Sequence, residues 1–458
     1  MGKYFGTDGI RGIVNSGLDA ALAFKVGQAA AMVLAENSKN SRPFFTIGKD
    51  TRISGDMLEA AITAGLCSAG ADVLHLGIVP TPAVAFITTD CGADAGVVIS
   101  ASHNPYEHNG IKIFNGSGFK LSDELEARIE VLLDSNEALD MKQNGDIGRL
   151  IPRGREFVDR YVEHVVSMST GKIGKLKLMI DCANGAAIST VNDIFGRFPL
   201  ELELIRDHAD GCNINASCGS THIAGLGKMV VAGGYDLGIA FDGDADRVLA
   251  VDENGELVDG DKIMAICGAA MLAKGELANN AIVATVMSNL GFHEYCEKKG
   301  INLLCASVGD RNVLEKMLEC GYNLGGEQSG HLIFLDHATT GDGQLAAVRF
   351  LEVLSQSGKK LSELAQEIPT YPQVLHNVAI EGGNEVKQRV MNDENLFAKI
   401  NEEEAILGKA GRILVRPSGT EALIRVMVEC SHDELAKNAA SRLASYIESE
   451  AKHFKDVN

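Results

Sequence analysis

The sequence predicts an α/β protein made of three similar α/β domains with mixed, largely parallel sheets, plus a smaller C-terminal α+β domain. Three observations lead to this prediction. Apolar runs of strand length alternate with amphipathic helical segments, which is typical of parallel sheets covered by helices. Three of these runs end in glycine-rich polar loops, near residues 95–105, 236–247 and 322–331. After the paired prolines of residues 368–372, the pattern becomes that of an antiparallel sheet with helices.

The first part of the chain shows the alternation clearly. Apolar residues at helical spacing mark one helix face at Leu18, Leu22, Val26, Ala29 and Val33. Short apolar, β-branched runs predict buried strands at residues 44–47, 73–76 and 95–99. Further helices are expected at residues 57–67 and 122–134.

The later part repeats this scheme and then departs from it. The polar stretch 136–148 indicates a boundary or an excursion. Two further α/β cycles place strands at residues 176–181, 202–205, 237–241, 282–286 and 302–306, and before Glu327. In the last part we expect strands at 374–380, 411–416 and 423–429, with helical segments at 383–400 and 433–452. A chain of 458 residues exceeds one core, and we expect domains at 1–150, 151–255, 256–368 and 369–458.

The composition argues against several partners. A formal net charge of −20 disfavours nucleic acid and anionic membranes, which need a basic surface. A small phosphate ligand needs only a local cation cluster, and basic residues lie in or beside the motifs at Arg11, Lys112, Arg247, Arg416 and Arg425. Ten scattered cysteines without a Cys-x-x-Cys pair favour a reducing, cytoplasmic location. We find no signal segment and no apolar run of about 20 residues that would span a bilayer.

Asp242, Asp244 and Asp246 alternate after an apolar strand, so in an extended loop their side chains would point the same way. Two carboxylates about 4 Å apart repel by about 4 kcal/mol at an effective dielectric of about 20, so a partly buried cluster requires a cation. Hard oxygen ligands suit Mg²⁺. A solvated Asp-rich turn is the alternative, and a calcium-binding helix–loop–helix is disfavoured by the strand-like flanks and the context of Glu253.

Ser102 lies in the segment Ser-Ala-Ser-His-Asn-Pro, residues 100–105, at the end of the 95–99 run. This is where α/β proteins bind ligands, so Ser102 is a candidate nucleophile that carries phosphate. A serine that merely ends the strand is the alternative. Lys112 would act as a general acid or base if burial lowers its pKa, or it is a surface lysine at a strand edge. His103 has an imidazole beside the same site, for hydrogen bonding or proton transfer.

Two further loops supply ligand-binding groups. Glu327, Ser329 and His331 alternate with glycines and predict a short extended loop whose mixed donors and acceptors suit a hydroxyl-rich sugar. A second loop offers a guanidinium, hydroxyls and backbone N–H groups, which suit a phosphate, at Arg416, Ser418, Gly419 and Thr420. Together with the aspartates and Ser102, these loops indicate phosphoryl transfer on a phosphosugar.

Five segments together resemble the α-D-phosphohexomutase superfamily, in the family's order and over nearly the whole chain. They are the Phe-Gly-Thr-Asp-Gly-Ile-Arg-Gly run at 5–12, the Ser102 segment, the Asp242 loop, and residues 326–331 and 416–421. The bacterial glucosamine branch is the closest, because residues 326–331 read Gly-Glu-Gln-Ser-Gly-His. The mannose and glucose branch typically has Met in place of Gln328. The Thr-Thr-Gly-Asp-Gly run at 339–343 also suits the glucosamine branch.

The resemblance implies a heart-shaped protein of four domains around a central cleft: phosphoserine, metal-binding, sugar-binding and phosphate-binding, in chain order. It implies that Ser102 is the phosphoserine and that one Mg²⁺ per subunit is held by that phosphate and the three aspartates. We expect catalytic roles for Ser102, His103, Lys112 and Arg247. Substrate binding falls on Arg11, Glu327, Ser329, His331, Arg416, Ser418, Gly419, Thr420 and Arg425.

The implied reaction interconverts glucosamine 6-phosphate and glucosamine 1-phosphate through a 1,6-bisphosphate, for UDP-N-acetylglucosamine and cell-wall precursor synthesis. A second copy of the chain is a further expected partner, since a homodimer is compatible with the sequence. Two alternatives stay open. One is the same chemistry on glucose or mannose phosphate, and the other is a phosphosugar sensor that does not catalyse.

Overall fold

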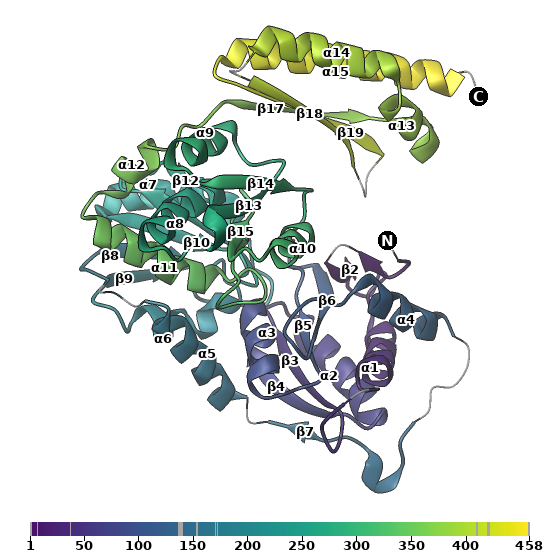
Figure 1. The fold of residues 1–458 in the computed structure, drawn as a ribbon. Coiled ribbons are helices and arrows are strands. Elements are labelled where there is room, and N and C mark those ends of the chain that lie inside the picture. Colours follow the sequence, from purple (N-terminus) through teal and green to yellow (C-terminus); the bar gives the residue numbers. More distant parts are fainter. Residues whose placement is uncertain are drawn as a thin grey trace. The chain divides into compact units, whose positions relative to one another are not determined.

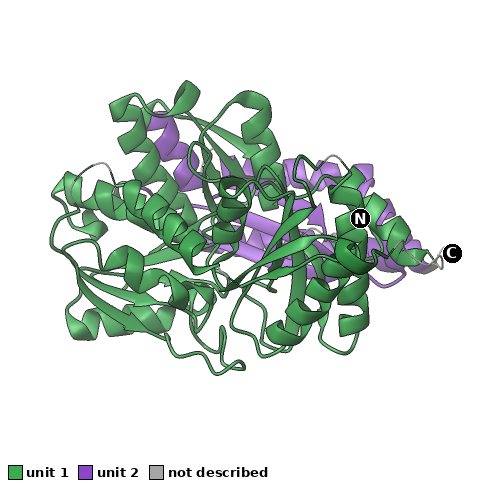
Figure 2. Cartoon of the chain, turned by 90° about the horizontal axis from the view of Figure 1, so that it is seen from below, with its two compact units in different colours: residues 1–287, 299–367 green, residues 288–298, 368–458 purple. Residues whose placement is uncertain are grey.

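The computed structural model describes all residues except 1, 7, 37, 136–140, 153, 170, 172, 409–410, 419–421 and 457–458. The predicted boundary at 136–148 therefore falls partly outside the described residues. The chain forms two compact units (Figure 2). The first unit comprises residues 1–287 and 299–367, and the second comprises 288–298 and 368–458. Three mixed α/β sheets form the first unit, and the second contains a three-stranded antiparallel sheet.

The first sheet has seven strands in the order β1-β2-β6-β5-β3-β4-β7 (Figure 1). They are β1 (Phe5–Gly6), β2 (Gly9–Ile13), β3 (Phe44–Lys49), β4 (Asp72–Ile78), β5 (Ala95–Ile99), β6 (His108–Asn115) and β7 (Leu150–Ile151). One face shares a core with α1 (Ala20–Leu34), α2 (Gly55–Ser68) and α4 (Asp123–Asp134). The other face carries α3 (Thr81–Asp90), whose Val84 packs where Gly48 and Gly96 have no side chain.

The second and third sheets have five and four strands. The second has the order β12-β11-β10-β8-β9 and the third β14-β13-β15-β16. Their strands are β8 (Lys177–Asp181), β9 (Glu201–Ile205), β10 (Leu237–Phe241), β11 (Val248–Asp252), β12 (Leu257–Val258), β13 (Ala281–Thr285), β14 (Asn302–Ala306), β15 (Leu324–Gly326) and β16 (Leu332–Phe334). The α-helices are α5 (Arg155–Ser167), α6 (Val191–Phe195), α7 (Ala224–Gly233), α8 (Gly260–Lys274), α9 (Leu290–Lys299), α10 (Asp310–Cys320), α11 (Gly343–Ser357) and α12 (Leu361–Gln366). In the described residues, 3₁₀ turns lie at Asn144–Asp146, Ala186–Ser189, Ser220–His222 and Ala278–Asn280.

One strand order recurs in all three α/β sheets. The orders β6-β5-β3-β4, β11-β10-β8-β9 and β16-β15-β13-β14 each join three parallel strands to one antiparallel strand through a hairpin. The prediction of three similar α/β domains is therefore confirmed. Each hairpin connection carries one of the polar loops that the sequence singles out.

The second unit packs helices against an antiparallel sheet in the order β17-β19-β18. Its strands are β17 (Gln373–Ala379), β18 (Gly411–Pro417) and β19 (Leu423–Cys430), and its helices are α13 (Gly383–Met391), α14 (Glu394–Leu407) and α15 (Asp433–Asp456). The helical segment expected at 383–400 is two helices, because Asp393 caps α14 by accepting a hydrogen bond from the Asn395 N–H group. Most of α9 also belongs to this unit.

Candidate active site

Three hairpin loops of the first unit meet one another and carry most of the site residues predicted within that unit. We call them the serine loop (residues 100–105, after β5), the aspartate loop (242–247, between β10 and β11) and the glutamate loop (327–331, between β15 and β16). The serine loop meets the aspartate loop directly, because Ser102 Oγ donates a hydrogen bond to Asp242 Oδ2 at 2.6 Å. The glutamate loop joins them through an isolated β-bridge between Arg247 and His331.

Ser102 is buried and held in an uncommon conformation. Its side chain and backbone are only 2% exposed, and its φ of 51° lies in the left-handed region. The Ser102 N–H group donates to Ser100 Oγ at 2.9 Å, which fixes the turn after the strand. His103 Nδ1 lies 3.4 Å from Ser102 Oγ. Burial, followed by the charges of Arg247 and Arg11, lowers the pKa of His103 to about 4, so its ring is neutral at pH 7.

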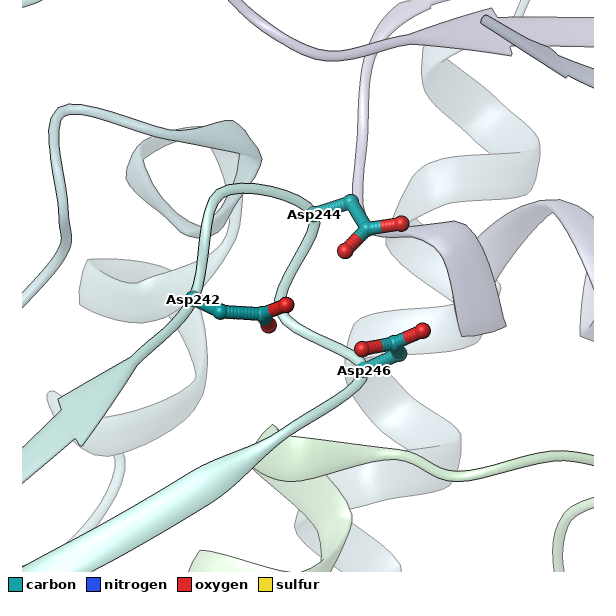
Figure 3. Close-up of side chains that lie close together, drawn as sticks. All are labelled: Asp242, Asp244 and Asp246. Atoms are coloured by element: carbon teal, nitrogen blue, oxygen red, sulfur yellow. The ribbon is translucent and has the colours of Figure 1, made fainter. Parts of the chain in front are cut away.

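The three aspartates converge, as Figure 3 shows. All three are buried, and one ligand oxygen from each lies within 4.8 Å of the others. The expected extended loop is wrong, because Ala245 has φ of 56° and its N–H group bonds to Asp242 O at 3.1 Å. Convergence comes from this tight turn. Burial, and then the charges of Asp246 and Asp244, raise the pKa of Asp242 well above its usual value.

The aspartate cluster fits a divalent cation. Asp244 Oδ1 and Asp246 Oδ1 are buried and accept no hydrogen bond, so each has a carboxylate oxygen available for a metal. Hard carboxylate oxygens suit Mg²⁺. Among the residues that the structure describes, only these three form a group of acidic, His or Cys side chains with such spacing. Thr81 holds the group from α3, since its hydroxyl donates to Asp244 Oδ2 at 2.6 Å.

Lys112 on β6 is the buried counter-ion of this loop. Its Nζ lies 2.9 Å from Asp244 Oδ2, 3.0 Å from Asp8 Oδ2 and 3.6 Å from Asp246 Oδ2. With 2% of the residue exposed, it is not a surface lysine. Burial lowers its pKa, but Asp244 and Asp8 raise it more, and the net direction is upward. The lowered pKa that the sequence analysis linked to acid–base catalysis is therefore wrong, and Lys112 stays a cation.

A chain of charges that the sequence analysis missed continues from Lys112. Asp8, between β1 and β2, accepts Lys112 on one oxygen and Lys120 Nζ on the other at 2.5 Å. Lys120 also pairs with Asp310 at the start of α10, whose Oδ2 lies 3.5 Å from His331 Nε2. Asp8 also pairs with Arg11, which is partly exposed on β2. Asp8 lies in the 5–12 motif, but no pattern marks Lys120 or Asp310.

The glutamate loop is a turn and not the extended segment we expected. Gly330 adopts φ of 95°, and its N–H group bonds to Glu327 O at 3.0 Å. Glu327 Oε1 accepts the Gly309 N–H at 3.0 Å, and Ser329 Oγ lies 3.4 Å from Glu327 Oε2. His331 is buried, and a Cβ at Gly341 would lie 2.5 Å from its ring atoms.

Gln328 and Arg247 have separate contacts. Gln328 Nε2 donates to Asp259 Oδ2 at 3.2 Å, so its amide secures the loop to the N-terminus of α8. Arg247 donates its backbone N–H to Asp242 Oδ1 at 3.2 Å. Burial lowers the pKa of Arg247, but Asp246 and Asp242 raise it further, so the side chain stays charged.

The predicted phosphate-binding residues lie in the second unit. Arg416 on β18 is directly opposite Arg425 on β19. Like charges in this position are destabilising, and burial followed by Arg425 lowers the pKa of Arg416. Two guanidinium groups side by side favour the binding of an anion such as phosphate. Ser418 is buried, and its carbonyl accepts Lys387 Nζ at 2.8 Å. Gly419 and Thr420 lie outside the described residues.

Known protein families and individual proteins are similar to this chain over nearly its whole length. Four models of the phosphoglucomutase/phosphomannomutase family match this chain: alpha/beta/alpha domain I at 2–140, domain II at 157–255, domain III at 259–371 and the C-terminal domain at 375–445. Phosphoglucosamine mutase of Acetivibrio thermocellus is 52% identical over 449 residues, covering 98% of this chain and 99% of that protein. The protein of the same name from Shouchella clausii is 48% identical over 447 residues, covering 98% and 99%.

Solved structures share the fold. A phosphoglucomutase/phosphomannomutase family protein from Burkholderia thailandensis has a TM-score of 0.82 and 25% identity, covering 99% of this chain and 98% of that one. Aspergillus fumigatus N-acetylphosphoglucosamine mutase, in complex with GlcNAc-6P and magnesium, has a TM-score of 0.68 and 18% identity, covering 98% and 96%. In the described part of this chain, no helix has the length and apolarity to cross a membrane.

Proposed function

Because the chain belongs to the phosphoglucomutase/phosphomannomutase family, we propose that it interconverts glucosamine 6-phosphate and glucosamine 1-phosphate. It is an intramolecular phosphotransferase of the isomerase class. The observation that carries the proposal is the contact between Ser102 Oγ and Asp242 Oδ2 at 2.6 Å, which joins a nucleophile to a cation-binding cluster. The product would supply UDP-N-acetylglucosamine and cell-wall precursor synthesis in the cytoplasm.

The proposed reaction passes twice through Ser102. A hydroxyl of the sugar phosphate attacks the phosphorus of phospho-Ser102, the bond from phosphorus to Ser102 Oγ breaks, and the hydroxyl proton leaves as Ser102 Oγ gains one. The product is a sugar 1,6-bisphosphate. After it turns end for end, Ser102 Oγ attacks its other phosphate, which restores phospho-Ser102 and frees a hydroxyl on the sugar. Phosphate is thereby conserved over each turnover.

The charged residues fit distinct parts of this cycle. Asp242, Asp244, Asp246 and the Ser102 phosphate would hold Mg²⁺, which when bound neutralises charge on the transferred group. Lys112 and Arg247 keep their protons, so they bind negative charge on phosphate. Because the His103 ring is neutral, it can accept a proton beside Ser102 Oγ.

The other predicted residues would hold the rest of the substrate. We assign the sugar to Arg11, Glu327, Ser329 and His331 of the first unit. We assign the non-reacting phosphate to Arg416, Ser418, Gly419, Thr420 and Arg425 of the second unit, where Arg416 lies directly opposite Arg425 and two neighbouring guanidinium groups suit an anion. This division gives the segments 1–150, 151–255, 256–368 and 369–458 the roles of phosphoserine, metal, sugar and phosphate binding.

Replacement of the nucleophile tests the proposal. Ser102→Ala should reduce mutase turnover by about a thousandfold or more, since covalent transfer needs the hydroxyl. Intact mass should show phosphate on the wild-type chain and none on the variant after incubation with glucose 1,6-bisphosphate. Ser117→Ala, in an exposed turn, is the matched control and should be unchanged. Undiminished turnover of Ser102→Ala would refute the mechanism.

Substrate comparison separates the alternatives. We expect kcat/KM with added Mg²⁺ to be higher for glucosamine 6-phosphate than for glucose or mannose phosphates. The reverse order would assign the same chemistry to another hexose. Sugar-phosphate binding without turnover, and without phosphate on Ser102, would instead identify a sensor.

A further inference from the structure

Two side chains outside the predicted site bind the backbone of the serine loop. Arg52 Nη2 donates to Ser102 O at 3.1 Å and to Asn104 O at 2.6 Å. Asn215 Nδ2 donates to the same two carbonyls, at 2.9 Å and 3.1 Å. The two carbonyls lie on either side of His103. The carbonyl of the nucleophile itself and the backbone on both sides of its neighbouring imidazole are therefore held by the same two donors.

The conformation of Ser102 explains why such donors are needed. A residue other than glycine in the left-handed region costs about 1–2 kcal/mol and persists only where its surroundings impose it. Ser102 has φ of 51°. The carbonyl oxygens of Ser102 and Asn104 each accept a hydrogen bond from both donors while Ser102 is in this conformation. The four hydrogen bonds thus select it over the ordinary extended one.

Both donors are themselves held in place. The Arg52 side chain is fully buried and pairs with Asp50, which also accepts the Arg52 N–H at 2.9 Å. Asn215 lies in the segment between β9 and α7, and its N–H group bonds to Ala183 O at 2.9 Å. Its own φ of 59° is one that asparagine tolerates. The side chains of Arg52 and Asn215 are therefore already in place before the reaction begins.

The aspartate loop packs against the same contact. A Cβ at Gly243 would lie 2.5 Å from Ser102 O and 2.8 Å from Asn215 Nδ2. Glycine therefore lets the aspartate loop approach the carbonyl that Asn215 holds. A shift of the Ser102 carbonyl would change the distance from Ser102 Oγ to Asp242, because both loops meet at this point.

We propose that Asn215 and Arg52 are positioning residues, which hold the Ser102 backbone so that Oγ keeps one place against the aspartates in both phosphoryl transfers. The inference rests on the proposed function. Phosphoryl transfer depends on the placement of attacking and leaving oxygens, and a displacement of about 1 Å costs up to about a hundredfold in rate. The two residues act on the rate of transfer and not on substrate affinity, because neither is assigned a substrate contact.

Substitution of Asn215 tests this. Asn215→Gly removes both donated hydrogen bonds and adds no strain at positive φ, whereas Asn215→Asp keeps the volume but has no N–H donor. For each variant we expect kcat to fall by about tenfold or more, with KM for glucosamine 6-phosphate changed by less than about twofold. The rate at which glucose 1,6-bisphosphate phosphorylates Ser102, followed by intact mass, should fall in parallel.

Asn213→Ala is the matched control. Asn213 lies in the same loop and donates to His208 O at 2.9 Å, so the variant loses a loop contact but not the serine contacts. It should keep the wild-type kcat and phosphorylation rate. If Asn215→Gly unfolds, Asn215→Asp supplies the same comparison, and thermal unfolding of each variant reports which case applies.

The proposal is overturned if both Asn215 variants phosphorylate Ser102 and turn over at the wild-type rate. It is also overturned if they lose activity only in proportion to a lowered Tm that Asn213→Ala shares. A wild-type chain without mutase turnover would contradict the proposed function instead, and phosphorylation of Ser102 would then still compare the variants.

Discussion

Replacing Lys112 by methionine should expose how strongly the aspartate loop depends on one buried cation. Its Nζ lies 2.9 Å from Asp244 Oδ2 and 3.0 Å from Asp8 Oδ2. At an effective dielectric of about 20, each attraction amounts to about 6 kcal/mol, and most of it is offset by the desolvation of the charges. Removing one partner of a buried ion pair costs about 3–5 kcal/mol, because the other charge remains buried without compensation.

This loss should depend on divalent metal. In EDTA, Lys112→Met leaves Asp244 without its cationic partner, whereas Asp8 keeps Lys120 and Arg11, so about 3 kcal/mol should be lost. With saturating Mg²⁺, positive charge returns to Asp244 while the contact of Lys112 with Asp8 stays lost, so we expect the deficit to fall by about half. Since 1 kcal/mol shifts Tm by about 2–4 °C in domains of about 150–250 residues, the deficit in EDTA should be roughly 6 °C or more.

Differential scanning calorimetry of wild type and variant, each in EDTA and in Mg²⁺, measures these deficits. Lys49→Met is the control, since Lys49 Nζ pairs with Asp56 at 2.6 Å and with Glu59, away from the aspartate loop. Its deficit should be the same in both conditions. A Lys112→Met deficit that Mg²⁺ does not change, or one below about 1 kcal/mol, would refute the assignment of Lys112 as counter-ion of this loop.

Two further predictions concern Asp342, a buried carboxyl that caps α11 by accepting a hydrogen bond from the Leu345 N–H group, and Thr81, which contacts the aspartate loop. Burial raises the pKa of Asp342 to about 6, above its unfolded value of about 3.9, so stability is lost as pH rises from about 4 to about 6, by about 3 kcal/mol. Asp342→Asn should abolish this loss in urea unfolding measured across that range, and an unchanged pH dependence would contradict the shift. Thr81→Val removes the hydroxyl that donates to Asp244 Oδ2 at 2.6 Å, and should weaken Mg²⁺ binding by about tenfold in calorimetric titration. Thr89→Val on the same helix should not, and equal affinities for the two variants would be evidence against a supporting role.

The positions of the three loops could be predicted because each follows a short buried strand that contains no charged residue. Ala95–Ile99 and Leu237–Phe241 are buried at every residue, and both end where glycine and polar residues begin. A buried strand that stops in such a sequence must place the next residues at the sheet edge. Ser102 and the aspartates are therefore predictable from the local pattern, without knowledge of any distant contact.

The shapes of the loops could not be predicted in the same way. Alternating residues point one way only in an extended chain, and Ala245 and Gly330 turn the backbone with positive φ. Glycine at 330 indicates that a positive φ is possible there, whereas alanine at 245 gives no sequence signal for a positive φ. The convergence that the sequence predicted was thus right for the aspartates, although the conformation assumed for it was wrong.

The supporting residues depend on long-range contacts. Lys112 is 132 residues from Asp244, and Asn215 is 113 residues from Ser102. Whether Lys112 is a surface cation or a buried one depends on carboxylates that only the folded topology brings near. Asn215 follows no apolar run and belongs to no periodic pattern, so its two hydrogen bonds to the serine loop have no local signal.

The backbone at position 102 also determines which hydroxyl amino acid could carry the proposed phosphate. Threonine has the same nucleophilic group, and its phosphate ester is a comparable donor. Its branched Cβ, however, makes a φ of 51°, the value at Ser102, a severe outlier. This turn therefore admits serine and rejects threonine on steric grounds alone, before any substrate has bound.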